Sequence, residues 1–245
     1  MGQSVKIEVM IDASLARSRP ISGLASLWQS TIGKKYVMAI TGLIWFGYLI
    51  LHLWGNLKIY AGPQFLNEYG GFLRSVGEPF FGASQLLWLA RIVLIPAFII
   101  HIWSAVQLRT RDMASRPRGY AMRKNLESTI ASRSMLYGGL FILLFVIYHV
   151  LDFTFGTVNP SYEERNIYHN VIASFRVWPV SLFYILAMVA VGLHLFHGIW
   201  STFQTLGWNT ARTNRLLRNG ATFFALLLTL GNISIPVAVL AGLVK

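Results

Sequence analysis

Histidines recur inside the apolar stretches of this sequence, where an imidazole has no water to bind. Only His169 lies in a polar connection. The other five, which stand among lipid-compatible side chains, are His52, His101, His149, His194 and His197. Ionisable side chains at such positions are costly and usually mark function. The chemistry open to them is hydrogen bonding to a neighbouring helix, proton relay or metal ligation.

The stretches that carry these histidines are long enough to cross a bilayer. The chain has 245 residues, 55% of them hydrophobic and 12% charged, which is too apolar for a soluble domain of this length. A membrane-spanning helix needs about 20 apolar residues. Five windows reach this length: Tyr36 to Leu57, Ser84 to Leu108, Ser134 to Phe155, Trp178 to Leu206 and Asn219 to Val244. The sequence therefore predicts an all-α membrane protein with five transmembrane helices.

Positive charge is distributed unevenly between the connections. Lys and Arg number five in residues 1–35, seven in 109–133 and three in 207–218, against two in 58–83, two in 156–177 and one at Lys245. Because cytoplasmic connections are enriched in Lys and Arg, we expect a cytoplasmic N-terminus and an external C-terminus. The net charge of +12 is then mostly an orientation signal, with membrane lipid or an acidic cytoplasmic partner as its targets. Nucleic-acid binding is not expected.

The parts outside the windows are short. Residues 1–35 are interpreted as a retained cytoplasmic tail, because no small-residue cleavage site follows a short apolar core, and 36–245 as the membrane domain. No connection exceeds about 35 residues, which leaves no room for a soluble catalytic domain. The chain has no cysteine, which excludes thiolate-ligated iron–sulfur clusters and thioether-bound haem.

The depth of each histidine follows from the rise of about 1.5 Å per helical residue. His52 lies sixteen residues, and His149 fifteen, from the predicted inner ends of their windows, which places both in the outer half of the membrane. The second and fourth windows run in the opposite direction. His101 lies seventeen residues, and His194 sixteen, from their outer ends, which places both in the inner half. The sequence thus predicts two levels, with one pair of histidines at each.

Two imidazoles at equal depth on neighbouring helices suit the two axial positions of a haem iron. Helical bundles commonly build cofactor sites from side chains on facing helices. We therefore expect the first four helices to form a bundle that binds two b haems, His52 with His149 and His101 with His194. A single membrane histidine more often bonds a neighbouring helix, and a proton relay usually includes carboxylates, but four histidines in two matched pairs favour ligation.

Three further polar residues belong to this prediction. His197 is three residues from His194 and shares its helix face, so periodicity does not choose the ligand. The spare imidazole is expected to bond a haem propionate, a quinone or the backbone. Arg91 lies about 10 Å inside the outer edge of its window, where it either binds a propionate or extends to the headgroups. Asp152, one turn beyond His149, is expected at the membrane interface.

The chain resembles the single-chain, five-helix, dihaem cytochrome b anchor of succinate dehydrogenases and quinol:fumarate reductases, respiratory complex II. The resemblance covers most of residues 30–208. Four segments carry it: STIGKKYVMAITGLIWFGYLILHLWGNL, LARIVLIPAFIIHIW, ASRSMLYGGLFILLFVIYHVLDF and LFYILAMVAVGLHLFHGIWSTFQTLGW. In that family one histidine on each of four helices is a haem ligand, and the last precedes a Gly-Ile-Trp-Ser segment by four residues. This position is His194, and the family pairing agrees with the pairing from depth.

The resemblance also implies partners and a location. It implies a bacterial cytoplasmic membrane and two cytoplasmic partner subunits, a flavoprotein with covalent FAD and an iron–sulfur protein. The anchor itself would be a non-catalytic subunit that exchanges electrons between the iron–sulfur subunit and a membrane quinone, menaquinone by analogy with relatives that have two haems. Some relatives carry a glutamate for proton transfer on the fourth helix, and this chain has no carboxylate there. Possible quinone contacts are Ser30, Lys34 and Trp208 near the inner face, and Glu68 or Arg74 near the outer face.

Two other functions fit the same residues. A dihaem cytochrome b can serve another membrane dehydrogenase, such as a formate dehydrogenase or a hydrogenase, and the subunit that co-purifies would distinguish it. A haem-free transporter can line a polar path with histidines, and an absorption spectrum of the purified chain would distinguish that.

Overall fold

The computed structural model describes residues 23–115 and 130–245 as an all-α chain. Its elements in order are α2 (Gly23–Gln29), α3 (Thr31–Asn56), η1 (Leu57–Ala61), α4 (Pro63–Ser75), α5 (Gln85–Ala114), α6 (Ile130–Phe153), α7 (Ile167–Phe175), α8 (Trp178–Thr205) and α9 (Asn214–Leu240). The predicted tail falls in part on residues 1–22, which lie outside the described residues. Its remainder forms α2 and the first turn of α3, because the hydroxyl of Ser30 caps α3 by accepting a hydrogen bond from the Gly33 amide.

Five of these helices are long and apolar enough to cross a membrane, which confirms the five predicted windows. They are Thr31–Ala61, Gln85–Ala114, Ser134–Phe153, Trp178–Thr205 and Asn214–Leu240. The chain is therefore a multi-pass membrane protein. The first and last helices begin earlier than the apolar windows do, at Thr31 and Asn214, because polar and basic residues extend a helix beyond the hydrocarbon at no cost.

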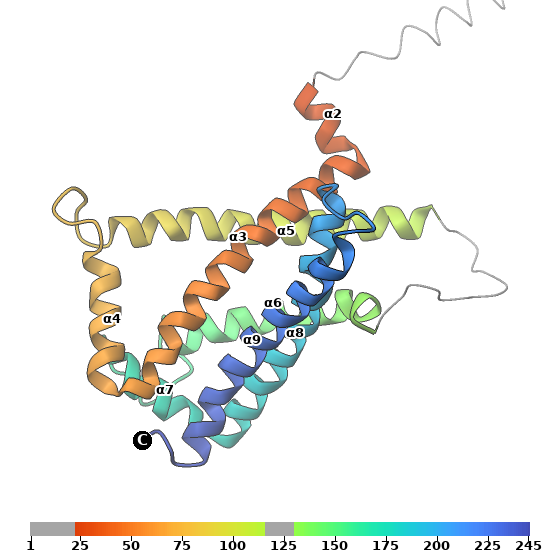
Figure 1. The fold of residues 1–245 in the computed structure, drawn as a ribbon. Helices are drawn as coiled ribbons and strands as arrows, with labels where there is room; N and C mark the ends of the chain where they lie inside the picture. Colours follow the sequence, from red (N-terminus) through yellow and green to blue (C-terminus); the bar gives the residue numbers. More distant parts are fainter. Residues whose placement is uncertain (1–22, 116–129) are drawn as a thin grey trace, which may run out of the picture.

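Three membrane helices pack side by side and two cross them. Helix α8 packs against α3, α6 and α9, and α5 packs against α3. Figure 1 shows α3, α8 and α9 running together, with α5 and α6 inclined to them. The approach of α8 to α9 is close at Gly192, where a Cβ would collide with the side chain of Thr229. Small residues allow such contacts in membranes, where backbones must come close to pack.

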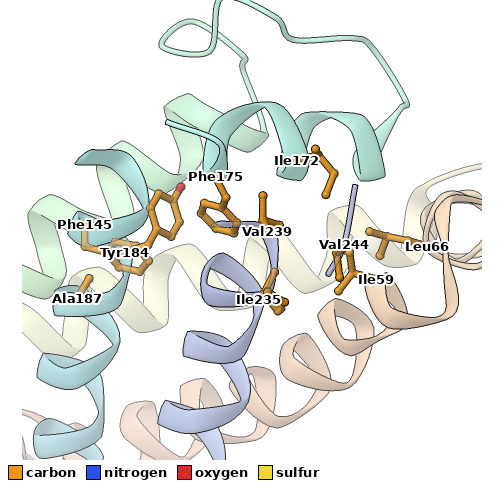
Figure 2. Close-up of a cluster of buried hydrophobic side chains, with 11 residues drawn as sticks. Ile59, Leu66, Phe145, Ile172, Phe175, Tyr184, Ala187, Ile235, Val239 and Val244 are labelled. Atoms are coloured by element: carbon orange, nitrogen blue, oxygen red, sulfur yellow. The ribbon is translucent and has the colours of Figure 1, made fainter. Parts of the chain in front are cut away.

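The two ends of the bundle differ in structure. One end carries α4, α7 and the C-terminus, and the opposite end carries α2 and the connection between α8 and α9 (Figure 1). At the first end α7 packs against α4, α6, α8 and α9 and encloses a buried apolar cluster that includes Ile172, Phe175, Tyr184 and Val239 (Figure 2). A second cluster, which includes Leu53, Leu195 and Leu228, lies between α3, α8 and α9. The two cores therefore hold α3, α6 and α8, which carry the histidines other than His101 and His169.

Candidate functional site

The first pair of histidines joins α3 to α6. The ring centroids of His52 and His149 lie 5.8 Å apart, with the ring planes at 86°. Both side chains are partly buried. Aromatic rings surround His149, since the centroids of Phe145 and Phe153 lie 5.6 Å and 5.4 Å from its own. This pair stands toward the end of the bundle that carries α7.

The second pair joins α5 to α8. The ring centroids of His101 and His194 lie 6.2 Å apart, with the ring planes at 59°. The pairs that depth predicted are thus the pairs whose rings lie close together. In the described part of the chain, His197 makes no ring contact and no hydrogen bond, so the geometry pairs His194, and not His197, with His101.

The two pairs lie at separate levels, and two helices give the same spacing. On α3, the ring of His101 is close to Thr41 and Gly42, eleven and ten residues before His52. On α8, His149 contacts Tyr184, ten residues before His194. At a rise of about 1.5 Å per residue, the levels are about 15 Å apart. This is about half of the roughly 30 Å hydrocarbon thickness.

The paired imidazoles span helices that do not pack closely. The closely packed pairs in the described chain include α3 with α5, α6 with α8 and α3 with α8, but neither α3 with α6 nor α5 with α8. Each histidine pair therefore bridges a separation that backbone packing leaves open. A small cavity of about 70 Å³ adjoins the second pair, lined by Ser134, Met135, Gly138, Ala190, Leu193 and His194.

The Nδ1 atoms of three of these histidines have hydrogen-bonding partners. Nδ1 of His101 lies 3.1 Å from the carbonyl oxygen of Met38 and 3.2 Å from the hydroxyl of Thr41. Nδ1 of His52 lies 3.4 Å from the hydroxyl of Tyr48. Because a carbonyl only accepts, Nδ1 of His101 carries the proton, and Nε2 keeps its lone pair. No Nε2 of these histidines bonds another described residue, so this atom is free to bind a metal.

The remaining Nδ1 atoms belong to His149 and His194. Nδ1 of His149 lies 3.5 Å from the hydroxyl of Tyr184. Nδ1 of His194 is buried and has no hydrogen-bond partner within the described ranges. A buried polar atom without a partner is costly, and a metal at Nε2 of His194 would not remove that cost.

The donor set restricts which metal group fits. No cluster of three or more His, Cys, Asp or Glu side chains able to hold a metal ion occurs in residues 23–115 and 130–245. Two imidazoles suffice only where another ligand fills the remaining coordination positions, as a porphyrin does. Metal–imidazole bonds of about 2 Å place two opposed rings with their centres about 6 Å apart. The spacings of 5.8 Å and 6.2 Å fit that arrangement.

Arg91 makes one aromatic contact. Its guanidinium carbon lies 4.8 Å from the centroid of the Trp88 ring, and its side chain is partly buried. It forms no ion pair with a described carboxylate. A propionate partner for Arg91 stays a prediction.

Asp152 lies inside the protein, and its expected position at the membrane interface stays a prediction. Only 1% of its surface is exposed. Its Oδ2 accepts hydrogen bonds from the hydroxyls of Ser174 at 2.7 Å and Tyr184 at 2.8 Å. Helix α7 folds over this end of α6 and supplies Ser174, so the carboxylate lies inside the protein. The sequence carries no local signal for this contact, because the partners are 22 and 32 residues away.

The possible quinone contacts belong to elements at the two ends of the bundle, the start of α3 and the α8–α9 connection at one end and α4 at the other (Figure 1). Ser30 caps α3, and Lys34 is buried, with its Nζ donating to the Trp28 carbonyl at 2.6 Å. Glu68 accepts a hydrogen bond from Gln64, and Arg74 donates to the Gly70 carbonyl, both within α4. The side chain of Trp208 is exposed after α8. Ser30, Lys34, Glu68 and Arg74 each make a hydrogen bond within their own part of the chain. A quinone site formed by these residues stays a prediction.

The fold and these side chains define the class: a helical, multi-pass membrane protein with paired histidines between its spans. Comparisons with protein-family models, with curated protein sequences and with solved structures found no match to this chain.

Proposed function

We propose that this chain is the membrane-anchor cytochrome b subunit of a succinate:quinone oxidoreductase. It binds two b haems, one between His52 and His149 and one between His101 and His194, and passes electrons between an iron–sulfur subunit and a membrane quinone, menaquinone. The observation that carries the proposal is the pair of imidazole contacts, at 5.8 Å and 6.2 Å, between helices that do not pack closely. The family resemblance of residues 30–208 supports the choice of enzyme complex.

The haems, when bound, supply one-electron carriers at two depths. The residues of the chain hold and insulate them. Nε2 of each paired histidine is the ligand atom, and partners at Nδ1 set the ring orientation at three of the four positions. The apolar clusters that include Leu53, Leu195 and Tyr184 bury parts of the helices that carry His52, His149 and His194. Burial of this kind is one means by which a protein sets a haem potential.

The orientation belongs to the proposal as well. The excess of Lys and Arg in the sequence of 109–133 and 207–218 supports a cytoplasmic position for the end with α2, where the flavoprotein and iron–sulfur subunits would dock. The pair of His101 and His194 is then the inner one, nearer those subunits. His52 and His149 form the outer pair, toward α7 and the C-terminus.

The test is the absorption spectrum of the full chain purified from haem-replete cells. We expect reduced bands of low-spin b haem, with about two haems per chain by pyridine haemochrome. His52→Ala and His149→Ala should each remove the same haem, because both would hold one iron. His169→Ala is the matched control, since this histidine lies outside the spans and bonds the Ser161 carbonyl, and it should keep both haems.

An absence of the Soret band would contradict the proposal and favour a transporter. The complex purified with its partners tests the choice of enzyme. Covalent flavin and succinate-dependent dye reduction are expected. A molybdenum or nickel subunit in their place would assign the chain to another dehydrogenase.

A further inference from the structure

A buried carboxylate lies next to the His52 and His149 pair. Asp152 is on the last turn of α6, one turn beyond His149, and is 1% exposed. Its Oδ2 accepts hydrogen bonds from Ser174 of α7 and Tyr184 of α8. Within the described residues it has no ion-pair partner. Burying a carboxylate is costly unless it is paired or hydrogen-bonded, and two hydroxyl donors offset part of that cost.

Tyr184 connects this carboxylate to His149. Its hydroxyl donates to Oδ2 of Asp152 at 2.8 Å, and the same oxygen lies 3.5 Å from Nδ1 of His149. A tyrosine hydroxyl has one hydrogen, and Tyr184 donates it in the hydrogen bond to Asp152. The hydroxyl oxygen of Tyr184 can therefore only accept a hydrogen bond from Nδ1–H of His149. Figure 2 shows the Tyr184 ring held between Phe145 and Phe175, and their centroids lie 5.2 Å and 4.9 Å from its own.

We infer that Tyr184 and Asp152 are positioning residues that orient the imidazole of His149 and raise its strength as a metal ligand. This inference rests on the proposed function. The chain of bonds from Asp152 through Tyr184 holds the proton on Nδ1 and directs the lone pair of Nε2 away from Tyr184. A hydrogen bond that draws the Nδ1 proton toward an anion makes the imidazole a better donor, which stabilises the ferric over the ferrous iron.

The other three paired histidines lack this connection. Nδ1 of His52 meets the hydroxyl of Tyr48, and Nδ1 of His101 meets a backbone carbonyl and Thr41. Nδ1 of His194 has no partner in the described part of the chain. None of these contacts leads to a carboxylate. The effect therefore belongs to one haem, which makes the other haem an internal reference.

The experiment is a redox titration of the purified complex, followed by the absorbance of each haem. In Tyr184→Phe we expect haem content to stay at the wild-type level and the midpoint potential of the outer haem to rise, while that of the inner haem stays constant. A tenfold change in the ferrous-to-ferric ratio corresponds to 59 mV for this one-electron couple. Asp152→Asn should shift the same potential upward, and Ser174→Ala, which keeps Tyr184, should shift it less.

Tyr137→Phe is the matched control, because Tyr137 is on α6 but is 76% exposed and should leave both potentials unchanged. The low-spin ferric electron paramagnetic resonance signal of the outer haem should change in Tyr184→Phe and stay unchanged in Tyr137→Phe. If the hydrogen bonds only join α6, α7 and α8, Tyr184→Phe and Asp152→Asn would lower the thermal stability and leave both midpoint potentials unchanged.

Unchanged potentials in both Tyr184→Phe and Asp152→Asn, at full haem content, would overturn the inference and leave the proposed function intact. Wild-type protein without haem would overturn the proposed function itself. If Tyr184→Phe fails to assemble, Asp152→Asn and Ser174→Ala decide, since both retain the tyrosine.

Discussion

At the scale of single residues, the depth of a histidine along its helix predicted its partner. His52 with His149 and His101 with His194 follow from the helical rise, because each imidazole is fixed to a helix of known direction. The structure adds which nitrogen is free. Nδ1 of His101 is held by the Met38 carbonyl, so its Nε2 faces away from that bond. Nε2 is therefore the atom of His101 that can bind a metal.

The choice between His194 and His197 is a prediction at this scale. His194→Ala should remove the inner haem, because its ring lies 6.2 Å from that of His101. His197→Ala should retain it, because His197 makes no ring contact among the described residues. Haem content per chain, measured by pyridine haemochrome on both variants, checks this. Loss of the inner haem in His197→Ala with retention in His194→Ala would reverse the assignment.

No feature of the sequence indicated that Asp152 contacts Ser174 and Tyr184. Tyr184 stands in an apolar run and looks compatible with lipid, and Ser174 stands in a connection between spans. Their contact with Asp152 depends on how α7 folds over the ends of α6 and α8. A side-chain contact between separate elements has no periodic signal in the sequence, so no window or spacing reveals it.

At the scale of elements, the long helices were predictable and the short ones were not. Five apolar windows become five spans because hydrocarbon leaves a backbone no partner except its own helix. Helices α4 and α7 lie in the connections 58–83 and 156–177, where the composition is mixed. Pro63 begins α4 and the Asn166 side chain caps α7, but such caps also occur in loops.

The contact of α8 with α9 gives a prediction at this scale. A Cβ at Gly192 would collide with Oγ1 of Thr229, so Gly192→Ala should destabilise the bundle by about 1–3 kcal/mol through overpacking. The midpoint of thermal unfolding of the detergent-purified protein measures the effect. Thr229→Ala in the same chain should restore most of the loss, because it removes the colliding oxygen.

Gly220→Ala on α9 is the matched control for that experiment. A Cβ at Gly220 would meet nothing within 4 Å, and alanine favours a helix over glycine by up to about 1 kcal/mol. This variant should therefore be as stable as the wild type or slightly more so. Equal destabilisation by Gly192→Ala and Gly220→Ala would show that close helix packing is not the cause.

At the scale of the whole molecule, charge and fold agree on two unlike ends. The end with α7 encloses an apolar cluster, and at the other end Arg111 of α5 donates a hydrogen bond to the Gln29 carbonyl of α2. The proposed orientation places the α7 end outside. Because the chain contains no cysteine, a single introduced thiol reports the side on which it lies.

The topology prediction uses two such variants. Glu164→Cys, whose side chain is 84% exposed beside α7, should react with an impermeant maleimide on intact cells. Ala211→Cys, exposed between α8 and α9, should react only after permeabilisation. Haem content should stay at the wild-type level in both, as neither residue touches the histidine pairs. The opposite labelling pattern would show that the protein is inserted in the reverse orientation. The pair of His52 and His149 would then be the inner one.

The sequence by itself determined the number of spans, and it predicted their alternating directions and the levels of the histidines. These properties depend on local composition and on the fixed rise of a helix, so they need no knowledge of packing. Only the tertiary structure decided that α3 and α6 stand apart with His52 and His149 between them, and that Asp152 is enclosed behind Tyr184. Such contacts arise when whole helices pack, because the angle and separation of two helices depend on all the side chains between them.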